Sequence, residues 1–135
     1  MFSNSELQTI VWTSNADKAK HFYSNVSGLR FIKTSHGALV YDVNGGCLRV
    51  SPVPSTGPSE HTVLGFSIPD IHAAVRRLDA HGIELERFPG FAQGDNHILN
   101  ISNGDKVAWF RDPDGNLLSA VQYAPESTGG SPATA

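Results

Sequence analysis

The sequence predicts an α+β fold built from two tandem β-α-β-β-β units. The same order of strand, helix and further strand-like segments occurs twice, at a spacing of about 55 residues. In each copy a glycine, Gly28 or Gly82, follows the helical pattern and can adopt the left-handed conformation that ends a helix. Two copies that mix strands and helices favour a paired, pseudo-symmetric fold over a solenoid of stacked repeats.

The first unit is expected over residues 7–53. Residues 7–13 are rich in β-branched and aromatic side chains, which is typical of a strand, and Ser14 to Asp17 offer N-cap side chains for a helix. The apolar residues of that helix follow the spacing of one buried face: Ala19, Phe22, Tyr23 and Val26. Three strand-like runs follow, separated by tight-turn sequences, at residues 29–34, 38–43 and 47–53.

A Pro- and Ser-rich linker at residues 54–60 leads into the second unit, expected over residues 61–124. It begins with a strand at residues 62–68, and Pro69-Asp70 marks the start of a helix. Its helical face and later strand candidates are Ile71, Ala74, Val75 and Leu78, and residues 83–88, 106–110 and 117–123. Residues 90–104 are interpreted as a loop with one short strand around 98–101, and residues 125–135 as a disordered tail after a single domain at 1–124.

Composition narrows the classes of partner. The chain has 135 residues and a formal net charge of -3, and its Lys and Arg residues are scattered, so nucleic acid is not an expected partner. No apolar run approaches the roughly 20 residues that a membrane-spanning helix needs. The lone Cys47 has no cysteine within the chain to pair with, and the first seven residues lack a signal-peptide pattern. These features predict a cytoplasmic protein.

The final hairpin is the most specific motif. A strand ends in Trp109-Phe110-Arg111 and leads into Asp112-Pro113-Asp114-Gly115-Asn116. Together with the duplication, this segment resembles the last hairpin of the vicinal oxygen chelate superfamily, which comprises glyoxalases, bleomycin-resistance proteins and extradiol dioxygenases. The resemblance covers residues 7–123 and implies curved mixed sheets that form a ligand cavity. It also implies a homodimer with cavities at the interface.

The resemblance places the superfamily's metal ligands at four positions, which are Gln8, Arg49, Val63 and Ser119 in this chain. Glutamine can offer an amide oxygen, but arginine, valine and serine are not plausible ligands of a divalent ion. We therefore expect no cofactor. The expected function is that of a bleomycin-resistance-like protein that binds, and so sequesters, a small aromatic or anionic molecule.

The resemblance implies that Gln8, Arg49 and Ser119 face the uncovered sides of the sheets, and the two-residue period of a strand then brings Trp12 and Tyr123 to the same faces. These five residues are predicted to line the binding site. Trp12 and Tyr123 would stack on the ligand, and Arg49 would meet an anionic group. One alternative is that Trp12 is a core residue. For Arg49, the alternatives are that it pairs with a carboxylate of its own chain or of a dimer partner, or that it points outward at a sheet edge.

Two other functions stay open at this point. One is a metal-dependent lyase of the glyoxalase type, or a dioxygenase, that uses Gln8 and His61, because His61 precedes Val63 by one strand period. The other is a structural or interaction domain whose cavity is filled by its own side chains.

Overall fold

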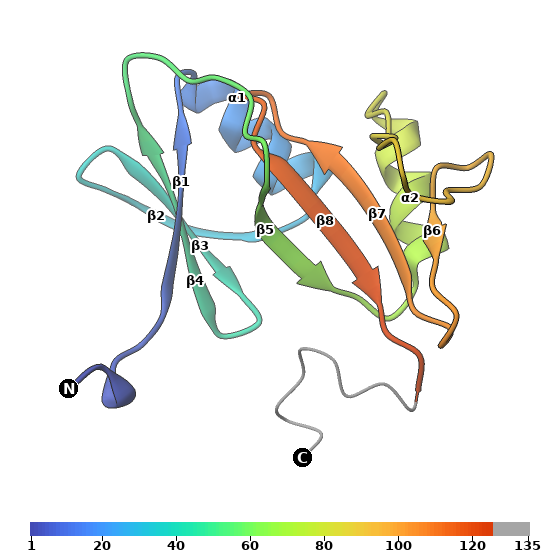
Figure 1. Cartoon of the computed structure of the whole chain (residues 1–135). Helices are drawn as coiled ribbons and strands as arrows, with labels where there is room; N and C mark the ends of the chain where they lie inside the picture. Colours follow the sequence, from blue (N-terminus) through green and yellow to red (C-terminus); the bar gives the residue numbers. More distant parts are fainter. Residues whose placement is uncertain (126–135) are drawn as a thin grey trace. The chain divides into compact units, whose positions relative to one another are not determined.

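The computed structural model describes residues 1–125, and these residues contain two four-stranded mixed sheets (Figure 1). The chain divides into two compact units, one formed by Met1–Glu60 with Asp112–Asn116 and the other by the rest of the described chain. The α+β fold of two β-α-β-β-β units with curved sheets is confirmed. No helix among the described residues is long and apolar enough to cross a membrane. The expected tail falls almost entirely outside the described residues.

The first unit follows the predicted order. After a short 3-10 turn at Phe2–Asn4, its elements are β1 (Gln8–Thr13), α1 (Ala16–Lys20), a π-helical stretch (His21–Val26), β2 (Arg30–Ser35), β3 (Ala38–Val43) and β4 (Gly46–Pro52). The strand order is β1-β4-β3-β2, with β1 parallel to β4 and the other pairs antiparallel. The Asn15 side chain caps α1 by accepting a hydrogen bond from Lys18 N, as the sequence predicted.

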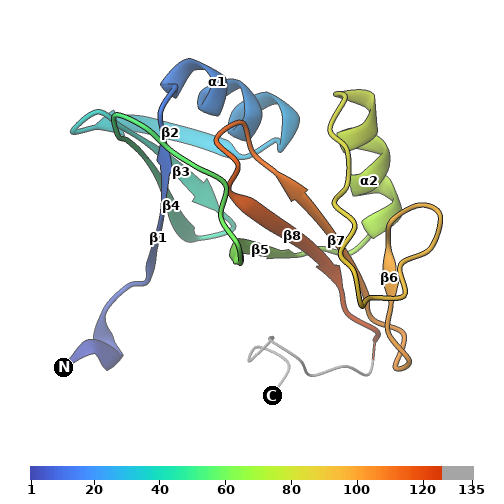
Figure 2. The same cartoon turned by 45° about the horizontal axis from the view of Figure 1, so that its top comes forward.

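The helical segment covers one face of this sheet (Figure 2). The π-helical stretch carries three of the buried side chains, Phe22, Tyr23 and Val26, and the Tyr23 ring lies 6.1 Å from that of Tyr41 on β3. The core on this side also includes buried residues of the strands: Val11, Leu39, Leu48 and Val50. The opposite face of the sheet has no helix of its own unit against it.

The second unit contains β5 (Thr62–Ser67), α2 (Ile71–Ala80), β6 (Leu99–Asn100), β7 (Lys106–Arg111) and β8 (Leu117–Gln122). The strand order is β5-β8-β7-β6, which repeats the pattern of the first unit. The Asp70 side chain caps α2, and this helix packs against β7 and β8 (Figure 2). Ile71, Ile98 and Ala108 form the centre of the core on the helix side.

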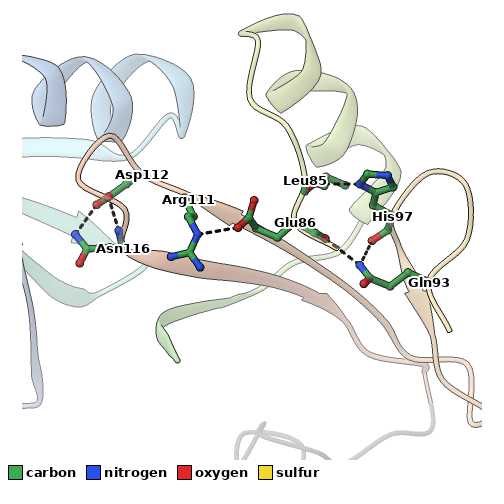
Figure 3. Close-up of polar contacts among 7 residues, drawn as sticks. All are labelled: Leu85, Glu86, Gln93, His97, Arg111, Asp112 and Asn116. Atoms are coloured by element: carbon green, nitrogen blue, oxygen red, sulfur yellow. Dashed lines mark hydrogen bonds and ion pairs between the residues drawn. The ribbon is translucent and has the colours of Figure 1, made fainter. Parts of the chain in front are cut away.

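One predicted strand is wrong. Residues 83–88 form no strand, and Glu86 N donates a single hydrogen bond to Trp109 O at the edge of β7. The buried side chain of Gln93 explains the difference, because it binds the backbone groups that a strand would use (Figure 3). Its Oε1 accepts from Phe88 N, and its Nε2 donates to Glu86 O and His97 O. The Gln93 side chain thus supplies hydrogen bonds to these backbone groups that neighbouring strands of a sheet would otherwise supply.

The turn between β7 and β8 belongs to the first compact unit. Asp112 is 6% exposed, and its carboxylate accepts hydrogen bonds from Tyr23 Oη at 2.6 Å and from Asn116 Nδ2 at 2.8 Å, as well as from the backbone N of Asp114 and Asn116. Burial, together with the Asp112 carboxylate, raises the pKa of Tyr23 far above its usual value. Tyr23 therefore stays protonated and acts as a hydrogen-bond donor.

Asp114 of the same turn fixes the end of β1. Its Oδ1 accepts hydrogen bonds from Ser14 N at 2.7 Å and from the hydroxyls of Ser14 and Thr56. Burial by itself raises the pKa of Asp114, but these hydrogen bonds outweigh it and hold the pKa below its usual value. Gly115 is required here, since it has a φ of +85° and an added Cβ would lie 2.9 Å from Pro58 Cα.

Replacing Tyr23 with Phe removes one of the four hydrogen bonds to the buried Asp112 carboxylate. We expect the free energy of unfolding to fall by about 1.5–3 kcal/mol, the usual range for a hydrogen bond to a charged group. Urea unfolding measures it as a lower midpoint with an unchanged m-value. Tyr123→Phe is the matched control, because no hydrogen bond of the Tyr123 hydroxyl is found within residues 1–125. Equal midpoints for the two variants would contradict this account.

The lowered pKa of Asp114 predicts an acid-dependent loss of stability. A carboxyl group whose pKa is depressed in the folded state stabilises the fold above its unfolded-state pKa, and this contribution is lost as pH falls through the folded-state pKa. Asp114→Asn should therefore be less stable than the unaltered chain at neutral pH, and the difference should shrink below about pH 4. Thermal unfolding of both proteins between pH 7 and pH 3 measures this. A difference that does not change with pH would show that the Asp114 charge is not involved.

Candidate functional site

Three of the predicted site residues share the face of the first sheet that no helix of its own unit covers, which we call its open face. In the β1–β4 register, Gln8 is the partner of Cys47 and Ile10 of Arg49, and Trp12 follows Ile10 on the same face. Trp12 is 60% exposed and Ile10 55%. Trp12 is therefore not a core residue. The face presents a large exposed ring and an aliphatic side chain beside the guanidinium of Arg49.

Arg49 lies beside these apolar side chains on the open face. It is partly buried, and its Nη2 donates a hydrogen bond to Ser35 O at 3.1 Å. No ion pair of Arg49 is found within the described part of the chain, whereas Arg30 on the same sheet pairs with Asp42 at 3.5 Å. A guanidinium has five N–H donors, so most of those of Arg49 are left for a ligand.

The turn after β7 positions Trp12. Asn116 Nδ2 donates a hydrogen bond to Trp12 O at 3.0 Å, and Asp114 binds Ser14, two residues further along the chain. Trp12 therefore lies at a strand end that two side chains of one turn hold in place. The exposed ring is carried by an ordered backbone, which lowers the entropy lost when a ligand stacks on it.

Cys47 has no activating partner on this face. Its antiparallel neighbour on β3 is Asp42, whose two carboxylate oxygens accept hydrogen bonds from Gly45 N and from Arg30. Both oxygens of the Asp42 carboxylate therefore already accept a hydrogen bond. The arrangement does not provide the adjacent base that a thiol nucleophile needs.

The remaining two predicted residues belong to the second unit. Ser119 on β8 is 7% exposed and lies on the sheet face opposite α2, where its β7 partner is Trp109. Tyr123 follows the last residue of β8 and is partly exposed. The predicted residues therefore divide between the units, with Gln8, Trp12 and Arg49 in the first and Ser119 and Tyr123 in the second.

Sequence analysis missed an aromatic cluster on the same face as Ser119. The Trp109 ring is stacked on Phe91 at a centroid distance of 5.5 Å and meets Phe88 edge-on at 5.3 Å. Next to Trp109 on this face, Arg111 Nε donates to Glu86 Oε1 at 2.7 Å (Figure 3). Trp109 could have been found from the hairpin register, which places it opposite Ser119. The positions of Phe88 and Phe91 depend on an irregular loop that shows no periodic pattern.

A groove of about 430 Å³ lies on the helix side of the second unit, lined by Val75 and Asp79 of α2 and by neighbouring loop residues that include Glu84 and His97. The His97 Nδ1 contacts Leu85 O at 3.1 Å (Figure 3). No group of three or more His, Cys, Asp and Glu side chains that could hold a metal ion occurs within residues 1–125. The groove is separate from the open sheet faces that the sequence predicted as binding surfaces.

The residues at the positions where the resemblance expects metal ligands do not fit a metal ion. Arg49 places a cation on the open face of the first sheet, and Val63 has no donor atom. His61 precedes β5, and the register of β5 against β8 shifts between Thr62 and Leu64, so the two-residue period does not extend back to His61. We derive no step through a metal ion.

Comparison with known proteins gives one family. The model of the Glyoxalase/Bleomycin resistance protein/Dioxygenase superfamily matches residues 7–119. A lactoylglutathione lyase from Agrobacterium tumefaciens has a TM-score of 0.68 at 18% identity, with 88% of this chain and 93% of that chain covered. A fosfomycin resistance protein from Listeria monocytogenes has a TM-score of 0.68 at 14% identity, with 91% and 96% covered. These identities show a shared fold alone. The search of curated proteins gave no match.

The two tryptophans should differ in solvent contact, because Trp12 is 60% exposed while Phe88 and Phe91 cover parts of Trp109. Trp109→Phe leaves Trp12 as the emitter, and we expect red-shifted fluorescence that acrylamide quenches strongly. Trp12→Phe leaves Trp109 and should give bluer, less quenchable emission. If the two variants emitted and quenched alike, the exposure assigned to these two rings would be wrong.

Proposed function

The chain belongs to the Glyoxalase/Bleomycin resistance protein/Dioxygenase superfamily, and we propose that it binds and sequesters a small organic anion with an aromatic part, without a metal ion. The observation that carries this proposal is the state of Arg49. A partly buried guanidinium without an ion-pair partner in residues 1–125 loses hydration that no protein carboxylate replaces. An anionic ligand would supply the missing charge.

The neighbours of Arg49 favour an aromatic ligand. Its direct partner in the β1–β4 ladder is Ile10, and Trp12 lies one strand period further along β1. The exposed indole offers a stacking surface worth about 0.5–1.5 kcal/mol beyond the burial of apolar area. Gln8 on the same strand offers an amide that can donate and accept hydrogen bonds. A flat ring bearing a carboxylate, phenolate or phosphate matches this set of groups.

Sequestration is favoured over turnover by the chemistry of this face. Cys47 lacks a free base beside it, and Arg49 takes the place of a metal-binding side chain. Binding alone needs only shape, stacking and charge, which Gln8, Trp12 and Arg49 provide. A lactoylglutathione lyase and a fosfomycin resistance protein share this fold, and their names are compatible with either catalysis or binding on the family's scaffold.

We also propose that the protein acts in the cytoplasm as a homodimer. Strand β1 lies at the edge of its sheet. Its apolar residues Ile10 and Trp12 are more than half exposed, and so is Leu7, which directly precedes the strand. Such an edge would be protected by a second chain. Sedimentation equilibrium measures the mass of the assembly, and a monomer at all concentrations would contradict this part of the proposal.

The proposal predicts that Arg49→Ala weakens binding of 2-naphthoate, a flat aromatic carboxylate, by at least about tenfold, because a charged hydrogen bond contributes about 1.5–3 kcal/mol. Isothermal titration calorimetry measures this loss. Arg49→Lys should recover part of the affinity, since the charge remains but the paired N–H donors do not.

Arg30→Ala is the matched control, because it removes another arginine of the same sheet that Asp42 already neutralises. Its affinity for 2-naphthoate should equal that of the unaltered chain. Equal losses in both variants would show only a general effect of charge, and no loss in Arg49→Ala would overturn the proposal. Stoichiometric metal in protein purified without a histidine tag, lost in Gln8→Ala and His61→Ala, would replace it with the metalloenzyme alternative.

A further inference from the structure

The open face of the second sheet contains a hydroxyl group that has no hydrogen-bond partner within residues 1–125, on a serine that is largely buried. Ser119 is 7% exposed, and within residues 1–125 its hydroxyl makes no hydrogen bond. Its Oγ is not one of the fully enclosed atoms, in contrast to Asp114 Oδ2. A serine hydroxyl that makes no hydrogen bond to the protein can still donate one hydrogen bond and accept two, and such groups usually bond to water or to a ligand. The Ser119 hydroxyl is therefore available to a group that approaches this face.

Gly65 leaves room beside this hydroxyl. It is the partner of Ser119 in the parallel β5–β8 ladder, and a Cβ added at Gly65 would lie 3.1 Å from Ser119 Oγ. Any other residue at this position would crowd the hydroxyl from that side. The absence of a side chain at Gly65 keeps one approach to Ser119 open.

On the other side of Ser119 stands the aromatic cluster. Trp109 is the antiparallel partner of Ser119 on β7, so the two side chains share one face. Phe91 stacks on Trp109, and the Phe91 ring is 52% exposed, so the cluster presents an aromatic surface to solvent. The 5.5 Å between the Phe91 and Trp109 centroids is too small for a third ring between them, so a ligand ring would pack against the outside of the cluster.

The charges near the cluster cancel. Arg111 follows Trp109 on the same face, and its Nε binds Glu86 Oε1 at 2.7 Å. This pair is partly buried and leaves no net charge for a ligand to neutralise. The second open face is therefore aromatic and neutral around the Ser119 hydroxyl, whereas the first open face carries the cation of Arg49, which has no ion-pair partner within residues 1–125.

We propose that Gly65, Phe91, Trp109 and Ser119 form a second subsite, which binds an uncharged flat ring through a hydroxyl, amine or carbonyl substituent on its edge. The ring packs against Phe91 and Trp109, and the substituent exchanges a hydrogen bond with Ser119 Oγ beside Gly65. This inference rests on the proposed function only in taking the open sheet faces as ligand surfaces. It adds that the second unit binds an uncharged ring with a polar substituent. The anion site at Arg49 could exist without this second subsite.

The test is a titration of ¹⁵N-labelled full-length protein with 2-naphthol, which is uncharged at neutral pH, followed by the two indole N–H signals in NMR spectra. Trp12→Phe and Trp109→Phe assign the signals. We expect 2-naphthol to shift the Trp109 signal and leave the Trp12 signal in place. Ser119→Ala and Phe91→Ala should each weaken binding about fivefold, the loss expected for one neutral hydrogen bond or one aromatic contact.

Phe2→Ala is the matched control for Phe91→Ala, because Phe2 is 78% exposed and lies in the other unit; it should bind 2-naphthol like the unaltered chain. Decahydro-2-naphthol has the hydroxyl but no flat ring and should bind more weakly. A shift of the Trp12 signal alone, or full affinity in Ser119→Ala and Phe91→Ala, would overturn the subsite. The Arg49 titrations with 2-naphthoate decide the anion site separately, because 2-naphthol has no charge for Arg49 to bind.

Discussion

The hydrogen bonds that converge on the Asp112 carboxylate are the interaction on which the first unit depends most. A carboxylate that is 6% exposed is tolerated only if its oxygens are satisfied, and Tyr23, Asn116 and two backbone N–H groups satisfy them. These bonds tie the helical segment that carries Tyr23 to the turn at 112–116. The same turn, through Asn116 and Asp114, holds the end of β1. The motif that identifies the fold from sequence is thus also the one that orders the strand bearing Trp12.

Sequence could predict this fold because its signals are local. The N-cap residues Asn15 and Asp70 each accept the expected backbone hydrogen bond, and Gly28 and Gly82 adopt the positive φ expected at a helix end. The two-residue period correctly places Gln8 and Trp12 of β1 on one face of the sheet. Arg49 of β4 shares that face because the β1–β4 register has no shift. These outcomes require only contacts between residues close in sequence, or within one ladder.

Sequence analysis failed where the structure depends on side-chain contacts of an irregular loop, which no periodic pattern marks. Residues 83–88 have the alternation of a strand, yet the side chain of Gln93, which follows this segment in an irregular loop, binds the polar groups of Phe88 and Glu86 that would have joined a sheet. The loop it organises brings Phe88 and Phe91 against Trp109. No periodicity encodes such a contact. The alternative that uses His61 is a separate prediction, which extends the two-residue period across the register shift between Thr62 and Leu64.

The two units show how a duplicated fold can acquire two chemistries. The backbone pattern is the same in both, with a parallel pair at one edge and antiparallel strands beyond it. Because the register fixes which face each side chain occupies, a substitution on an open face changes its chemistry while leaving the core on the helix side intact. On the first open face, Arg49 has no ion-pair partner within residues 1–125, which is the basis of the anion site that we propose. Ser119 and Trp109 make the second open face neutral and aromatic. Pseudo-symmetry of the fold therefore gives no reason to expect the same ligand group on both faces, and the two sites that we propose are separate predictions, each argued within its own sheet.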